Sequence, residues 1–306
     1  MRRASMHWRW VAALVLLVGL VAGVQWKVGW VEVLTAWSRV TPVDALVVVG
    51  LTAIGYFARA QRLAAHFGSP VREHPWHCLR IVSIHNAANN ILPMRTGEVG
   101  FPLLLKQTFG LRIGPTVASL LWLRLLDVLS LGLVVMVTLG VAHVGWALSV
   151  IGAVLVVLGP WGARSLLRRP WATPHFAART LSTLREGLPG DGRAVLGTQV
   201  WSLVHWGSKL AAYTWLLVRL GDVAVPTATL AAVAGEATSV LPVHGFAGAG
   251  TYEAGVLAVL RPLGVPWGQA VQAAVNLHLF LLAVSVVAAA LALMLPGRVA
   301  TAESRP

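Results

Sequence analysis

Two segments of the chain place ionisable side chains beside a Leu-Pro pair and glycines. Residues 92–98 read LPMRTGE and include Arg95 and Glu98. Residues 241–253 read LPVHGFAGAGTYE and end at Glu253. A guanidinium suits bidentate contact with a phosphate, and a glycine-rich backbone can point N–H groups at an anion. These residue types favour binding of an anionic group, and no hydrolase motif such as Gly-x-Ser-x-Gly or His-Glu-x-x-His accompanies them.

The first segment combines a predicted break in a helix with side-chain amides and a cation. Pro93 removes a backbone donor, and Gly97 permits a close approach or a positive φ. Asn89 and Asn90 can satisfy the freed backbone groups or contact a ligand, and both interpretations stay open. Arg95 can pair with the glutamate three residues later or face a phosphate. The cost of burying a charge in a membrane favours the functional interpretation.

The second segment alternates glycines with small residues, a pattern that can form an anion-binding nest. Gly248, Gly250 and Thr251 lie at its end, and Thr251 is the predicted N-cap of a following helix. His244 can titrate near neutral pH or only form a hydrogen bond. The glycines do not form a nucleotide fingerprint, because no strand–helix–strand pattern surrounds them.

Further ionisable residues lie in apolar surroundings. Arg124 and Asp127 are three residues apart, so an internal ion pair explains them as well as contact with a ligand does. Glu236 and Glu253 are candidates to carry protons or to pair with a cation. The candidate partner cations are Arg95, Arg124 and Lys209.

The composition indicates an integral membrane protein. Hydrophobic residues make up 57% of the 306 residues and charged residues 11%, against about 25% charged residues in soluble domains. The net charge of +13 then reflects cytoplasmic loops that meet anionic lipid, and we expect no nucleic acid partner. The single cysteine, Cys78, excludes an internal disulfide and a Cys-rich metal site, and we expect no metal or cofactor.

We expect an all-α integral membrane fold, with residues 1–306 as one polytopic domain of about six full transmembrane helices. The expected spans are residues 8–28, 42–60, 115–140, 144–160, 197–219 and 267–295. Two other apolar stretches, residues 79–110 and 226–261, carry Pro, Gly and charges in their middle. We predict that both form re-entrant broken-helix hairpins, because irregular backbone at membrane depth must be buried in protein or line a cavity.

The positions of Lys and Arg support this arrangement. If both interrupted stretches enter and leave on one side, both termini are cytoplasmic, as is a loop at about residues 161–196 with room for an amphipathic helix. The cations left outside are Lys27, Arg39, Arg219 and Arg261. The two hairpins then enter from opposite faces, as in inverted repeats, which place a substrate site near the midplane.

Three strings carry a resemblance to a known family. They are Asn89-Asn90-x-Leu92-Pro93-x-Arg95-x-Gly97-Glu98, Arg124-x-x-Asp127, and Leu241-Pro242…Gly245…Gly248-x-Gly250-x-x-Glu253. The chain resembles, from about residue 10 to residue 295, the transmembrane region of lysylphosphatidylglycerol synthases, a flippase-like membrane family. In full synthases a soluble aminoacyl-transferase domain follows this region. The 306 residues show no counterpart of that domain, so we do not expect aminoacylation.

The resemblance implies a flippase or transporter of a bacterial-type plasma membrane. Its cargo would be an anionic phospholipid or a polyprenyl, glycolipid or hopanoid-type lipid. The expected head-group residues are Asn89, Asn90, Arg95, Gly97, Glu98, His244, Gly248, Gly250 and Thr251, and the expected cavity or coupling residues are Arg124, Asp127, Glu236 and Glu253. The alternatives are a membrane transferase that modifies a lipid head group and a non-catalytic partner of a lipid-modifying enzyme. The cargo, the direction and the oligomeric state stay open.

Overall fold

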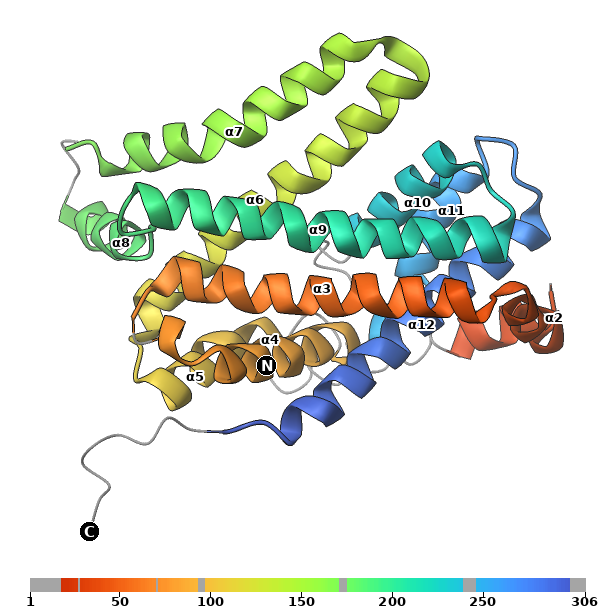
Figure 1. Ribbon diagram of the computed structural model, residues 1–306, viewed down its shortest axis with the longest axis horizontal. Helices are drawn as coiled ribbons and strands as arrows, with labels where there is room; N and C mark the ends of the chain where they lie inside the picture. The colour runs from red at the N-terminus through yellow and green to blue at the C-terminus, as the bar shows by residue number, and fades with distance from the viewer. Residues whose placement is uncertain are drawn as a thin grey trace. The chain divides into compact units, whose positions relative to one another are not determined.

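The structure is a computed structural model that describes residues 18–26, 28–69, 71–92, 97–170, 175–238 and 246–297. These residues form helices joined by turns, and no strand occurs among them (Figure 1). The predicted all-α membrane fold is confirmed. Residues 18–26 are helical, whereas the first half of the expected span at residues 8–28 lies outside the described residues.

Four described helices are long and apolar enough to cross a membrane. They are α3 (Pro42–Phe67), α6 (Ile113–Leu139), α7 (Trp146–Arg168) and α12 (Trp267–Leu293). Each contains or overlaps an expected span. The expected span at residues 197–219 lies in α9 (Gly192–Gly221), which passes the same test only together with α10 (Val225–Thr238), at a bend of 117°. The described residues thus contain four or five candidate spans.

Both interrupted stretches are broken helices. The first forms α4 (Pro75–Ile91) and α5 (Gly97–Phe109), and the second forms α10 and α11 (Thr251–Leu260). Gly97 lies so close to α4 that a Cβ atom there would come within 2.6 Å of the backbone of Ala88. A Cβ atom on Gly255 of α11 would come within 2.7 Å of the carbonyl oxygen of Ala234 in α10. Each pair therefore doubles back, as predicted, while entry into a membrane stays a prediction.

The chain divides into two compact units. The first consists of Met1–Ala53, Ile84–Glu98 and Ser208–Ala290, and the second of Ile54–Ser83, Val99–Gly207 and Leu291–Pro306. In the first unit, the short helices α2 (Trp30–Thr35) and η1 (Ala36–Arg39) precede α3. Its apolar core joins α2, residues 18–26 and α12. The buried members of that core are Val24, Val33, Val271 and Val275.

The second unit has a core shared by α3, α4, α5, α6 and the start of α9. Its largest buried side chains include Leu63, Ile81, Leu105 and Trp122. A π-helical turn, η4 (Gly140–Val144), joins α6 to α7, and the two helices form the yellow-green hairpin of Figure 1. The predicted loop at residues 161–196 contains the end of α7, the helix α8 (His175–Glu186) and the start of α9. The remaining short turns are η2 (Val71–Glu73) and η5 (Phe246–Gly248).

Candidate functional site

A buried carboxylate lies in the middle of α6, in the second unit. Asp127 is 6% exposed and about 21 Å along the helix from its first residue, at 1.5 Å per residue. It accepts hydrogen bonds from the guanidinium of Arg62, from Nη1 of Arg124 at 3.1 Å and from the indole Nε1 of Trp206 at 2.8 Å. Arg62 comes from α3 and Trp206 from α9, so one side chain joins three helices.

The surroundings of Asp127 carry more positive than negative charge. Arg62 is 5% exposed, and its Nη1 also lies 3.4 Å from the hydroxyl oxygen of Ser202. The charged groups that act on Arg59, one turn before Arg62 in α3, are Arg62, Arg124 and Asp127. Three guanidiniums thus gather around one carboxylate. Arg59 and Arg124 are partly buried, and guanidiniums at membrane depth pair with anions or line an aqueous cavity.

A second buried carboxylate, Glu253, lies in the first unit at the start of α11. Its Oε2 accepts the backbone N–H of Gly250 at 2.8 Å, and its Oε1 lies 2.6 Å from Nδ1 of His278. Both Glu253 and His278 are 4% exposed. His278 is about 17 Å along α12 from its first residue at the helical rise. The start of α11 therefore contacts the middle of a span-length helix.

Tyr252 packs between the Glu253–His278 pair and the residue next to another buried carboxylate, Glu236. Its ring stacks on the imidazole of His278 with centroids 4.7 Å apart. The phenol end of the same ring packs on Gly235, where a Cβ atom would lie 2.9 Å from Cζ. The neighbouring Glu236 accepts a hydrogen bond from Nζ of Lys209 at 2.6 Å. Four helices of the first unit, α9, α10, α11 and α12, thus supply one polar cluster.

The first hairpin also reaches α12. The side-chain amides of Asn86 and Asn90, in α4, donate to the hydroxyl of Ser285 at 3.3 Å and 2.7 Å. Ser285 lies seven residues after His278, or about 10 Å along α12. The last turns of α4 and the first turn of α11 therefore contact the same helix about two turns apart. Asn89 bonds instead to His85 at 3.1 Å, within α4.

The glycine-rich turn before α11 has left-handed backbone at three positions. The φ angles are 52° at Ala247, 75° at Gly248 and 81° at Gly250. The N-cap of α11 is Gly250, and the expectation for Thr251 is wrong: its hydroxyl donates to the carbonyl of Gly248 at 2.9 Å. The positive φ of Gly250 places the N-cap one residue earlier than expected. Glu253 then accepts the backbone N–H of this N-cap residue.

The expected site residues separate into several groups. Arg95 and His244 lie outside the described residues. Gly97 is buried against α4, and Glu98 is partly buried in the first turn of α5. Arg124 and Asp127 form the ion pair that was one of their two interpretations. Of the candidate partner cations, Lys209 bonds to Glu236.

Further residues that the sequence analysis did not select belong to these clusters, and four of them bond to an expected residue. They are Arg62, Trp206, His278 and Ser285. The expected span at residues 42–60 leaves Arg62 outside the membrane, whereas α3 continues to Phe67. His278 did have a sequence signal, since it is an ionisable residue inside an apolar run. In the described part of the chain, no group of three or more His, Cys, Asp or Glu residues could hold a metal ion.

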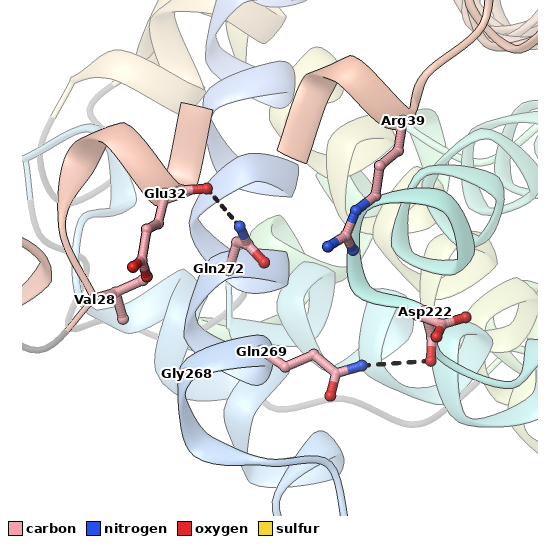
Figure 2. Close-up of a pocket in the computed structure, with 7 residues that line it drawn as sticks. All are labelled: Val28, Glu32, Arg39, Asp222, Gly268, Gln269 and Gln272. Carbon is pink, nitrogen blue, oxygen red and sulfur yellow. Dashed lines mark hydrogen bonds between the residues drawn. The ribbon is translucent and has the colours of Figure 1, made fainter. Parts of the chain in front are cut away.

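The first unit also contains an open polar cavity of about 380 Å³ (Figure 2). Gln269 and Gln272 project into it from α12, between Glu32, Arg39 and Asp222. Both amides already donate to backbone carbonyls, including that of Glu32. The lining carries two carboxylates and one guanidinium, so it does not suit an anion. It was not expected from the sequence.

Comparison with known proteins identifies a family and nothing closer. The model of the family described as "Lysylphosphatidylglycerol synthase TM region" matches residues 10–289. That match covers nearly the whole chain and all the clusters described above. No curated protein and no solved structure matches the chain.

Proposed function

Because the chain belongs to the lysylphosphatidylglycerol synthase transmembrane-region family, we propose that it moves a lipid with an anionic head group across a bacterial-type plasma membrane. The family supports a membrane protein that handles lipid head groups. The step to translocation rests on the buried charges. Buried ionisable residues in membrane helices generally line substrate or ion pathways.

The observation that carries the proposal is the gathering of basic side chains around Asp127. Arg62 and Arg124 bond to its carboxylate, and Arg59 adds a further positive charge near it. Asp127 lies about 18 Å from the C-terminal end of α6, close to its middle. A phosphate or phosphate-linked head group would balance this charge, and guanidinium groups bind such oxygens with two parallel hydrogen bonds.

The turn before α11 supports the same chemistry in the first unit. Its glycines leave no side chain over the backbone, and a helix N-terminus carries a partial positive charge. Gly248, Gly250 and Thr251 are the residues that we assign to head-group contact there. Arg95 and His244, outside the described residues, stay proposed head-group residues by their chemistry alone. The apolar tails would stay in the bilayer. The outward residues of α6, such as Val117, Leu121 and Val128, are exposed and apolar, as lipid contact requires.

The test is translocation by the purified protein in vesicles. Trace fluorescent lipids with anionic or zwitterionic head groups are added to both leaflets, and a membrane-impermeant reductant reports the protected fraction over time. We expect the protein to speed equilibration of the anionic lipid. Recovery of chemically altered lipid would instead identify a transferase, and neither movement nor alteration would favour a non-catalytic partner of another enzyme.

A single substitution tests the role of the cationic cluster. We expect Arg62→Gln to slow movement of the anionic lipid by about tenfold to a hundredfold, the size of one charged hydrogen bond. Movement of a zwitterionic lipid should fall less. Equal losses for both lipids would show that Arg62 has only a structural role.

A further inference from the structure

Glu253 differs from the other buried carboxylates in its partner. Among the described residues, Asp44 and Asp127 bond to arginines and Glu236 bonds to a lysine. Arginine and lysine keep their proton near neutral pH, whereas the ordinary pKa of histidine lies near 6.5. Glu253 faces His278. Of these four buried carboxylates, Glu253 is therefore the one whose partner is an imidazole, a group that has a neutral and a protonated form.

The titratable side chains on the neighbouring elements include Tyr252, Glu236 and Glu32. Tyr252 stacks on the imidazole and has a hydroxyl that is buried without a hydrogen-bond partner. On α10, Glu236 is bonded to Lys209 of α9, so the two charges offset each other. On α2, which packs against α12, Glu32 is exposed and lines the cavity of Figure 2.

Two further elements approach α12 or this cluster with titratable groups. On α4, which bonds to α12 at Ser285, the titratable residue is His85, and it bonds to Asn89. On α9, the ring of Tyr213 packs on Phe280 of α12 and lies beneath the ammonium of Lys209 at 5.4 Å. Neither group adds a further negative charge near Glu253.

We propose that the Glu253–His278 pair binds one proton for each anionic lipid moved and so couples transport to a proton gradient. This inference rests on the proposed function. A proton that enters converts the neutral imidazole to imidazolium, and only an N–H bond forms. The pair then changes from a net charge of −1 to zero, and the same bond breaks on release.

The position of Glu253 explains how the proton and the cargo would be linked. Its carboxylate accepts the N–H of Gly250, within the turn that we assign to head-group contact. With the imidazole neutral, the carboxylate repels an anion in this turn. With the imidazole protonated, that repulsion is cancelled, so the anion and the proton favour each other's binding. An anionic lipid carried with one proton also crosses without net charge.

The experiment uses the full-length protein in vesicles with a pH difference and the membrane potential clamped at zero. With one proton per lipid, a difference of one pH unit should produce about a tenfold difference in anionic lipid between leaflets at steady state. Protein-free vesicles give the baseline distribution. If wild type equalises the leaflets whatever the gradient, the coupling is refuted and the proposed function stands. If wild type moves no lipid, the proposed function is refuted and the coupling falls with it.

Substitutions test whether the Glu253–His278 pair couples lipid movement to the pH difference. His278→Gln keeps an amide donor for Glu253 but does not titrate. Glu253→Gln keeps an acceptor for the backbone N–H of Gly250. We expect both substitutions to abolish the tenfold difference in anionic lipid. His205→Gln is the matched control, because His205 is a buried histidine that bonds to the carbonyl of Gly55 at 2.9 Å. It should respond to the gradient as wild type does. Accumulation that still follows the gradient in His278→Gln would refute the assignment.

A second measurement covers variants that move no lipid. Infrared and nitrogen-15 NMR titration of solubilised protein, between about pH 5 and about pH 8, would report protonation of the carboxyl and the imidazole. We expect a step in wild type that disappears in His278→Gln. A wild-type protein without that step would refute the proposal, whatever the variants transport.

Discussion

At the scale of single residues, the partner of each buried carboxylate decides what it can do. Asp127 accepts bonds from Arg62, Arg124 and Trp206, so it is held as an anion and orders three helices. Glu253 is held by one backbone N–H and one imidazole, and an imidazole has a neutral and a protonated form. Two carboxylates of similar burial thus differ in chemistry because one faces guanidiniums and the other faces a histidine.

The bonds of Asp127 predict a large loss of stability on its neutralisation. We expect Asp127→Asn to lower the free energy of unfolding by about 3–5 kcal/mol, since it leaves buried guanidinium charge without its counterion. Thermal unfolding in detergent, followed by tryptophan fluorescence, would measure the change.

A surface ion pair provides the matched control. Arg112 and Glu186 are also joined at 2.9 Å, but their side chains are 78% and 45% exposed. Arg112→Gln should therefore cost less than about 1 kcal/mol. Equal destabilisation by the two variants would mean that burial does not govern the strength of the Asp127 cluster.

At the scale of elements, α12 organises both broken helices of the first unit. His278 of α12 bonds to Glu253 of α11. Ser285 of α12 accepts hydrogen bonds from two asparagines of α4. In the second unit, Arg80 of α4 donates to the carbonyls of Ala292, Leu293 and Leu295 at the end of α12. The carbonyl of Ala292 also accepts the backbone N–H of Leu295 at 3.1 Å, and a cation at a helix C-terminus satisfies carbonyls that lack a helical partner.

The close approach of α5 to α4 predicts a steric effect at Gly97. A methyl group in Gly97→Ala would lie 2.6 Å from the backbone of Ala88 and 2.5 Å from the side-chain oxygen of Asn89. We expect it to separate the two helices and to destabilise the protein by about 1–3 kcal/mol, the usual cost of overpacking. Thermal unfolding would measure this loss.

Gly100, one turn later in α5, is the control for that substitution. Nothing lies within 4 Å of the position where its Cβ would be. Gly100→Ala should therefore leave stability unchanged or raise it by up to about 1 kcal/mol through helix propensity. A similar loss from both substitutions would contradict the tight α4–α5 contact.

At the scale of the whole molecule, the charge distribution predicts how the chain crosses the membrane. With both hairpins re-entrant, Arg179 in α8 faces the cytoplasm and Leu263, after α11, faces outward. Both side chains are exposed. In a Cys78→Ala background, we expect an impermeant maleimide on intact cells to label Leu263→Cys and to leave Arg179→Cys unlabelled until the cells are opened. Labelling of both from one side would refute the re-entrant topology.

Composition and local pattern determined the class of this protein and the places where its helices break. Long apolar runs need helices to satisfy their backbone in a membrane, and Leu-Pro followed by glycines ends a helix wherever it occurs. These rules correctly predicted α3, α6, α7 and α12, and both breaks. The pair Arg124–Asp127 followed from spacing alone, because residues three apart share a helix face.

Tertiary structure decided which distant side chains meet. Arg62 and Asp127 are 65 residues apart, and Glu253 and His278 are 25 apart across a helix and a turn. Pattern rules act within a few residues, whereas these pairs depend on how whole helices pack. Only the packing showed that α12 contacts both hairpins. It also showed which of the two candidate glutamates, Glu236 and Glu253, faces a histidine: it is Glu253.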